Sequence, residues 1–309
     1  IEVRKLNDRY EHMGDTVRSV ADDPLQVKER HKQEKKDRKA AAKKAKKQRK
    51  KGTGEDAEER KRLYVLNFDG DIRANATDNL REEISVVLGQ AREGDEVLVR
   101  VESPGGLVHG YGLAASQLQR FRDAKVPLTV AVDKVAASGG YMMACVADRI
   151  LAAPFAVLGS IGVLAQLPNF HRLLQKHDID FELLTAGEYK RTLTMFGENT
   201  DKGREKFVEE LEETHALFKD FVGANRPSLD IAKVATGEVW YGSRALEEGL
   251  VDELCTSDDF VQKRLQDWDV LELRFVHKKN WQEKLGLAAE GAIERTLLRW
   301  WQRAQRPPL

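Results

Sequence analysis

The feature that most constrains the fold is a regular alternation of strand-like and helix-like segments between residues 63 and 153. Short apolar runs predict strands, and apolar residues spaced three and four apart predict helices between them. The expected strands are 63–68, 96–101, 128–132 and 150–153, and the expected helices lie near 80–88, 110–122 and 137–147. Strands joined through helices pair in parallel, so the sequence predicts an α/β fold with a mostly parallel, buried sheet.

Composition divides the chain into three parts. Residues 1–61 lack apolar periodicity, and we expect a basic stalk that is largely helical or disordered. Residues 62–275 are the predicted folded domain, which ends with a long amphipathic helix near 202–222 and a glycine-containing closing segment. Residues 276–309 mix Trp and Arg with Leu and predict a C-terminal amphipathic helix, either docked on a partner or membrane surface or packed on its own domain.

The basic part of the stalk lies between residues 28 and 51, where 14 Lys and Arg stand against three Asp and Glu in a chain of zero net charge. Its net charge of +11 is compatible with a solvated segment, with attraction to anionic lipids, or with nucleic acid. No aromatic residue lies between the basic ones, so stacking on bases is unsupported and nucleic acid is not expected as a partner.

Residues 150–170 form an uncharged run of 21 residues, long enough for a membrane-spanning helix. Proline and glycine interrupt it repeatedly, so we interpret it as short buried strands joined by glycine turns. The two cysteines, Cys145 and Cys255, lie in apolar surroundings without metal-ligand spacing and are expected to be small buried hydrophobic residues. No ligand cluster or phosphate-binding loop indicates a metal or nucleotide cofactor.

Two local patterns are typical of acyl-transfer chemistry. Ser138 follows the strand 128–132 and stands between small residues, as a nucleophile at a strand-to-helix junction does, although a helix-capping serine looks the same. Gly105 and Gly106 follow another predicted strand, and their N–H groups, with that of Gly139, suit an oxyanion hole, although an ordinary Pro-Gly turn also fits.

The base that such a serine needs is open at this point. His171 and His177 lie among polar residues, and His109 follows the glycine turn, so spacing alone does not exclude a Ser/His/Asp triad. Lys190 is the rival, because a desolvated lysine acts as a base, but a lone lysine is usually a surface residue.

Five motifs in order resemble the signal peptide peptidase A family, with a likeness extending from about Arg62 through Asp252. They are Glu102-Ser103-Pro104-Gly105-Gly106, Ala137-Ser138-Gly139-Gly140-Tyr141, Gly159-Ser160-Ile161-Gly162-Val163, Gly187-Glu188-Tyr189-Lys190 and Gly249-Leu250-Val251-Asp252. The resemblance implies a Clp protease/crotonase-type fold of repeated ββα units. It also implies a serine endopeptidase without a cofactor.

The same resemblance implies a role for each candidate site residue. Ser138 falls on the family nucleophile and Lys190 on its general base, while Ser160 falls on the serine that orients the lysine amine. Gly105, Gly106 and Gly139 fall on the oxyanion hole. Family members assemble into rings in which a neighbouring subunit can supply the lysine, so a homo-oligomer is expected here.

The expected partners are peptide or protein substrates, including remnant signal peptides, and a membrane surface reached through an upstream anchor and the basic stalk. The resemblance implies the bacterial inner membrane and leaves its side open. Two other functions remain: an acyl-CoA enzyme of the crotonase type, because the fold serves both chemistries, and a catalytically silent ring scaffold.

Overall fold

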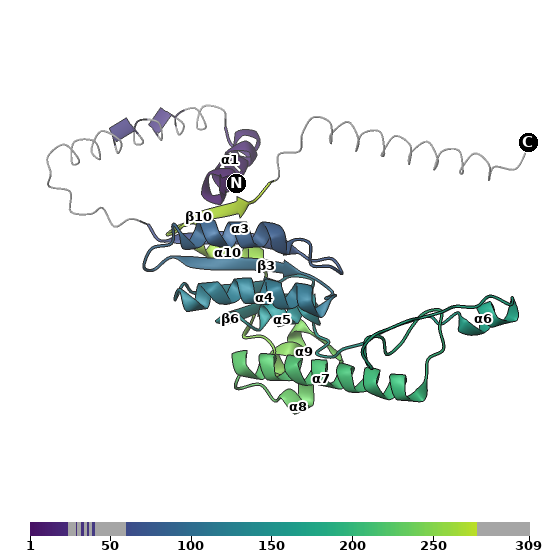
Figure 1. Cartoon of the computed structure of the whole chain (residues 1–309). Coiled ribbons are helices and arrows are strands. Elements are labelled where there is room, and N and C mark those ends of the chain that lie inside the picture. The colour runs from purple at the N-terminus through teal and green to yellow at the C-terminus, as the bar shows by residue number, and fades with distance from the viewer. Residues whose placement is uncertain (24–28, 30–31, 34–35, 37–38, 41–59, 277–309) are drawn as a thin grey trace, which may run out of the picture. The chain divides into compact units, whose positions relative to one another are not determined.

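The computed structural model describes residues 1–23, 29, 32–33, 36, 39–40 and 60–276 (Figure 1). Contacts divide the chain into two units, Ile1–Arg274 and Phe275–Leu309, and the first contains the elements discussed below. The predicted C-terminal helix at 276–309, apart from Val276, and most of the basic run at 28–51 lie outside the described residues.

In the described residues, strands form a seven-stranded sheet and a three-stranded sheet. The larger sheet has the order β1 (Glu2–Lys5), β10 (Asp269–Arg274), β2 (Arg62–Asp69), β3 (Glu96–Glu102), β4 (Leu128–Val132), β6 (Arg149–Ala152) and β9 (Glu253–Leu254). The smaller sheet has the order β5 (Val135–Ala137), β7 (Val157–Gly159) and β8 (Val239–Tyr241). Pairing in the larger sheet is parallel except between β1 and β10, which confirms the predicted mostly parallel sheet.

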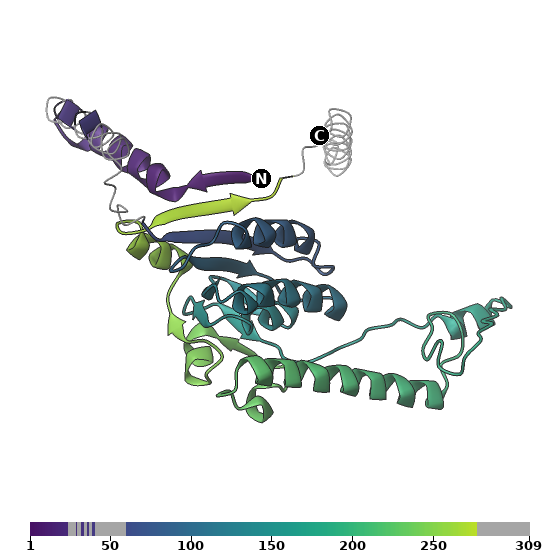
Figure 2. The same ribbon diagram turned by 60° about the vertical axis from the view of Figure 1, so that its left-hand side comes forward.

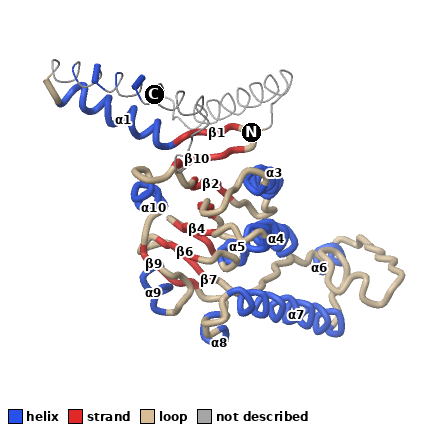
Figure 3. Tube along the Cα trace, turned by 90° about the vertical axis from the view of Figure 1, so that its left-hand side faces the viewer, coloured by secondary structure: helices blue, strands red, loops and turns tan. Residues whose placement is uncertain are grey.

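Helices cover both faces of the larger sheet, because its central strands are apolar on both sides. Figure 3 shows α3 (Thr77–Leu88) and α4 (Val108–Asp123) on one face and α10 (Ser257–Arg264) on the other. In β2, Tyr64 and Phe68 pack into the core under α3 and α4, whereas Leu63 and Val65 pack into the second core with Phe260 of α10. The remaining helices of the described residues are α1 (Leu6–Ala21), α5 (Gly139–Ala144), α6 (His171–Lys176), α7 (Asp201–Asn225), α8 (Ile231–Val234) and α9 (Gly242–Glu247).

The predicted ββα units are confirmed by the chain order. β4 of the larger sheet is followed by β5 of the smaller sheet and then by α5, and β6, β7 and α7 repeat this sequence. The unit that comes before these two in the chain begins with β3. There a single parallel bridge between Ser103 and Ala136 takes the place of the second strand, and α4 follows. In the units of β3 and of β4–β5 a short turn therefore leads directly to the start of a helix, whereas residues 160–200, which include α6, separate β7 from α7. The uncharged run 150–170 contains β6 and β7, as predicted, and no helix in the described part of the chain is long and apolar enough to cross a membrane.

The N-terminal boundary of the folded domain differs from the sequence prediction. We expected the domain to begin at residue 62, but β1 pairs antiparallel with β10, with Glu2 opposite Arg274, and Leu6 at the start of α1 is buried in the second core. The strand was missed because it is only four residues long and mostly charged, which leaves no apolar alternation to detect.

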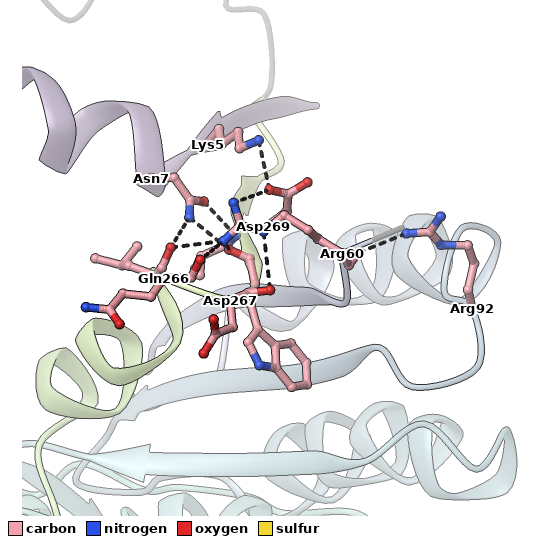
Figure 4. A network of polar contacts seen from close by, with 10 residues as sticks. Lys5, Asn7, Arg60, Arg92, Gln266, Asp267 and Asp269 are labelled. Atoms are coloured by element: carbon pink, nitrogen blue, oxygen red, sulfur yellow. Dashed lines mark hydrogen bonds and ion pairs between the residues drawn. The ribbon is translucent and has the colours of Figure 1, made fainter. Parts of the chain in front are cut away.

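Side chains hold this N-terminal strand and helix in place (Figure 4). The Asn7 amide donates to the carbonyl oxygens of Leu265 at 2.9 Å and Trp268 at 2.8 Å, and its Oδ1 accepts from the Val270 N–H at 2.8 Å. The Lys5 ammonium lies 2.9 Å from an Asp269 carboxylate oxygen. One amide thus satisfies three backbone groups in the turn between α10 and β10.

We predict that Asn7→Ala lowers the free energy of unfolding by about 1–3 kcal/mol, because it removes the acceptor of the Val270 N–H and one of the two donors to the Leu265 and Trp268 carbonyls, the other being Arg60. Urea unfolding followed by circular dichroism measures the change. The exposed His12 on the same helix provides a control, since His12→Ala should change stability by less than about 0.5 kcal/mol. Equal effects of the two variants would contradict a specific role for Asn7.

Candidate active site

Ser138 lies at the junction of a strand and a helix, as its sequence context predicted. β5 ends at Ala137, α5 begins at Gly139, and Ser138 between them has φ 52° and ψ −117°. The Ser138 N–H donates to the Gly159 carbonyl at 2.7 Å, and the Ser138 carbonyl accepts from the Met142 N–H at 2.9 Å. Residues other than glycine rarely adopt a positive φ, and such strained residues cluster at functional sites.

Gly105 packs directly against this serine. Its φ of +92° is in the region that favours glycine, and a Cβ there would lie 2.7 Å from the Ser138 Cβ and 2.9 Å from the Gly139 nitrogen. The Gly105 N–H donates to the Ser103 hydroxyl at 3.0 Å. Gly105 therefore allows its turn to pack closely against Ser138, but its N–H group is engaged by Ser103 and is not available to an oxyanion.

Gly106 and Gly139 carry N–H groups for which the described part of the chain provides no hydrogen-bond acceptor. Gly139 is the first residue of α5, and the first N–H groups of a helix have no partner within it. No hydrogen bond from the Gly106 N–H is found among the described residues, and a Cβ on Gly106 would lie 2.1 Å from the Ile72 carbonyl oxygen. Both glycines line one pocket with Ser138, so of the three predicted oxyanion-hole glycines these two have N–H groups to offer.

The pocket beside Ser138 has uncharged walls. Besides Ser138 and three glycines, it is lined by Val108, Met142, Val163, Thr214 and Phe218. The last two come from α7, which crosses beside α5. A hydrophobic side chain of a ligand would be desolvated here without leaving a protein charge unpaired.

Ser160 lies next to Ser138 because β5 and β7 pair in parallel. Ala137 pairs with Gly159, so the following residues of the two strands are neighbours. Ser160 also has a positive φ, 51°, and its N–H donates to the Glu238 carbonyl at 2.6 Å. The structure thus brings together Ser138, Ser160 and the three glycines predicted from the sequence.

Lys190 is not brought to Ser138 within this single chain. It lies in residues 164–200, here called the arm, which Figure 2 shows leading away from the sheets to α6 and returning to α7. The preceding ring, Tyr189, lies under the ammonium groups of Lys202 and Lys206 near the start of α7. The pocket begins at Thr214, eight residues or about 12 Å further along the helix at 1.5 Å per residue. In the described residues Ser138 and Lys190 share no hydrogen bond.

The histidines named as alternative bases are also separate from Ser138. His109 and His177 are exposed, and His171 begins α6 at the arm. His215 was not singled out from the sequence, but it follows Thr214 of the pocket, and its Nε2 lies 3.2 Å from the Ile161 carbonyl oxygen. None of the four is hydrogen-bonded to Ser138 in the described part of the chain.

Two residues beneath the glycines were not recognised from the sequence as parts of the site. Ser103 and Tyr111 are fully buried, their hydroxyl groups are hydrogen-bonded to each other, and the tyrosine ring packs against Gly139. Burial raises the pKa of the Tyr111 phenol, so it stays protonated at neutral pH. The only sequence signal was the serine of the Ser103-Pro104-Gly105-Gly106 turn.

A metal site needs several ligand side chains close together, and a reactive cysteine needs an ionised thiol. Within residues that the structure describes, no group of three or more His, Cys, Asp or Glu side chains is arranged to hold a metal ion. Both cysteines are free and buried, as predicted, and burial raises the pKa of Cys145 to about 12. Such a thiol stays protonated at neutral pH and is a poor nucleophile.

The chain is similar to known proteases. Residues 120–270 match the model of peptidase family S49, and residues 1–118 match the model of the S49 N-terminal region. It is 53% identical to the probable protease SohB of Haemophilus influenzae over 290 residues, which are 94% of this chain and 82% of that protein. It is 51% identical to the probable protease SohB of Buchnera aphidicola subsp. Schlechtendalia chinensis, covering 85% of this chain and 87% of that protein.

A solved structure of a mutant 1510-N membrane-bound stomatin-specific protease, in complex with a substrate peptide, superposes with a TM-score of 0.45 at 13% identity, covering 73% of this chain and 96% of that one. On the family models and the sequence relatives, the chain belongs to peptidase family S49. This membership confirms the resemblance predicted from the five motifs.

We predict that Gly139→Ala lowers the free energy of unfolding by about 1–3 kcal/mol, because its Cβ would lie 2.3 Å from the Tyr111 Cγ in a packed core. Gly112 is the matched control, since it is also a helix glycine but a Cβ there meets nothing within 4 Å. Gly112→Ala should stabilise by about 0.5–1 kcal/mol. Thermal unfolding compares them, and a neutral Gly139→Ala would contradict the packing.

Proposed function

We propose that the protein is a serine endopeptidase in which Ser138 is the nucleophile and Lys190 the general base. The observation that carries the proposal is the backbone of Ser138, which is held at positive φ in the lining of a pocket that Gly106 and Gly139 also line. Strain of this kind presents a serine hydroxyl to a substrate carbonyl while two N–H groups face the developing oxyanion.

The proposed chemistry needs only side chains and water. Ser138 Oγ attacks the peptide carbonyl as its proton moves to the unprotonated Lys190 amine, and Gly106 and Gly139 stabilise the oxyanion. The C–N bond breaks as Lys190 returns the proton to the leaving amine. Water then attacks the acyl-enzyme, its proton passing through Lys190, and the Ser138 hydroxyl is restored. Ser160, beside Ser138, is proposed to accept or donate a hydrogen bond that orients the lysine.

We propose that Lys190 reaches Ser138 from a neighbouring subunit of a homo-oligomeric ring. The arm exposes a group of large apolar side chains that a monomer would leave in water, among them Leu164 at 79% and Leu184 at 90% exposure. About 12 Å of α7, from Lys206 beside Tyr189 to Thr214 in the pocket lining, separates the neighbourhood of Lys190 from the pocket of its own chain. A head-to-tail contact between identical chains places one subunit's arm at the next subunit's pocket.

We predict that Ser138→Ala and Lys190→Ala each lower kcat at least about 10³-fold in a fluorogenic peptide assay, because each removes one partner of the proton transfer. Mixing the two inactive variants should restore about a quarter of wild-type activity, since random mixing pairs an intact serine with an intact neighbouring lysine at a quarter of the sites. Lys176→Ala, an exposed lysine of the same arm, is the control and should retain activity.

A fully active Lys190→Ala protein would overturn the dyad. Two inactive variants that do not complement each other would place the base within the same chain and overturn the contribution from a neighbour.

Chemical labelling distinguishes the two competing functions. A fluorophosphonate that labels Ser138 supports the peptidase, whereas saturable acyl-CoA binding without labelling supports a crotonase-type enzyme. Intact assemblies with neither labelling nor turnover on membrane-derived peptides support a silent scaffold.

The pocket is proposed to select small or aliphatic side chains on the acyl side of the cleaved bond. Phe218 is 4% exposed and forms part of the pocket wall together with Met142 and Val163. None of the residues that line the pocket is charged. We predict that Phe218→Ala shifts the kcat/KM preference toward larger apolar residues by about 10-fold, because about one aromatic ring of space is opened. A peptide series varied at that position measures it, and an unchanged preference would contradict the assignment.

We also propose that the protein acts at the bacterial inner membrane on hydrophobic peptides such as remnant signal peptides. The support is the +11 run between residues 28 and 51, which attracts anionic lipid, and the apolar pocket. Sedimentation with vesicles containing anionic lipid tests the attraction, and binding that persists when this run is replaced by Ser and Gly would contradict it.

A further inference from the structure

A chain of buried hydroxyl groups lies directly beneath the glycine turn of the proposed oxyanion hole. The Gly105 N–H donates to Ser103 Oγ at 3.0 Å, Ser103 Oγ lies 2.5 Å from Tyr111 Oη, and Tyr111 Oη donates to the Asp71 carbonyl at 2.8 Å. Both side chains are 0% exposed. A buried hydroxyl that loses its partner is costly, so the members of this chain hold one another in place.

The number of available protons fixes which group donates and which accepts in each of these hydrogen bonds. The phenol has one proton, which goes to the Asp71 carbonyl, so the Ser103 hydroxyl must donate to Tyr111. Ser103 Oγ is then the acceptor for Gly105. Every proton is assigned, and the amide of Gly105 is fixed relative to the loop at Asp71.

The same two residues contact both halves of the proposed oxyanion hole. On one side, Ser103 holds Gly105, whose neighbour Gly106 supplies one N–H group. On the other side, the Tyr111 ring lies where a Cβ on Gly139 would be, 2.3 Å from its Cγ. The backbone of Ser103 also accepts from the Ala137 N–H at 3.0 Å, just before Ser138.

Two further glycines leave space for this pair. A Cβ on Gly70 would lie 2.6 Å from both the Ser103 and the Tyr111 hydroxyl oxygens, and a Cβ on Gly140 would lie 2.6 Å from the Ser103 carbonyl oxygen. The turn after β2 and the first turn of α5 therefore close over the pair.

We propose that Ser103 and Tyr111 are positioning residues that set the separation and direction of the Gly106 and Gly139 N–H groups. Neither residue touches substrate. This inference rests on the proposed function, and it adds the buried pair through which the two oxyanion donors are held as one unit.

The test is Tyr111→Phe, which keeps the ring against Gly139 and removes only the hydroxyl. In the full-length assembled protein, kcat for a peptide substrate should fall about 10–100-fold, with KM changed less than about twofold. Misplaced N–H donors weaken stabilisation of the transition state and leave substrate binding unchanged. Affinity for a peptide boronate, which forms a tetrahedral adduct, should fall by the same factor as kcat.

Tyr141→Phe is the matched control. Tyr141 is also 0% exposed, and its hydroxyl donates to the Leu250 carbonyl at 2.9 Å, away from the glycine turn. Tyr141→Phe should lose about as much thermal stability as Tyr111→Phe, while its kcat and boronate affinity stay within about twofold of the wild-type values. A purely structural role for Tyr111 predicts that both tyrosine variants behave alike.

Ser103→Ala breaks the chain at its other end and keeps the proposal testable if Tyr111→Phe folds poorly. It should lower kcat to a similar extent, and the double variant should cost no more than the worse single variant because the hydrogen bonds are in series. Unchanged kcat and boronate affinity in folded Tyr111→Phe or Ser103→Ala, with Ser138→Ala inactive, would overturn the positioning pair alone. An active Ser138→Ala would overturn the proposed function, and the positioning pair would fall with it.

Discussion

The backbone of Ser138 is held in a conformation that costs a non-glycine residue about 1–3 kcal/mol, and the surrounding structure is arranged to keep it there. The parallel register of β5 and β7 directs its N–H to Gly159, and the first turn of α5 takes its carbonyl. With both backbone groups satisfied, the only group of Ser138 left to react is its hydroxyl. Its position follows from strand pairing and helix initiation together, and not from either alone.

The glycines around Ser138 follow from the same constraint. The turns that follow β2, β3 and β5 converge on a volume too small for additional Cβ atoms, and Gly70, Gly105, Gly139 and Gly140 each leave space for a neighbouring turn. Close packing of this kind fixes the positions of backbone N–H groups more firmly than side-chain contacts on an open surface can. The Tyr111 ring fills the volume beneath them, which links the core to the site.

Much of the fold was predictable because its central strands carry strong apolar runs. The strands at 63–68, 96–101 and 128–132 and the long helix α7 were expected within a few residues. β1 and the three-residue strands β5 and β8 of the smaller sheet were not, because so few residues give no periodicity. α5 is shorter than the predicted helix and begins at Gly139, since the tight turn at Ser138 occupies the positions before it.

The site was predictable only in part, for a related physical reason. Ser138 and the glycines could be recognised from the sequence, because the tight turns in which they lie require small residues within a few positions of one another. Lys190, the proposed base, gives no such local signal, because an exposed lysine of the arm could act as a base only through contacts with residues distant in sequence or on another chain. Tyr111 has the appearance of an ordinary core aromatic on α4, and its hydrogen bond to Ser103 depends on how the turn after β3 closes.

The most direct test of the central claim is a structure of the assembled protein after reaction with a peptide boronate. We expect boron bonded to Ser138 Oγ, one boronate oxygen within about 3 Å of the Gly106 and Gly139 nitrogens, and the Lys190 amine of a neighbouring subunit within about 3 Å of Ser138 Oγ. A covalent adduct on another residue, or Lys190 remaining distant from every Ser138 in the assembly, would contradict it.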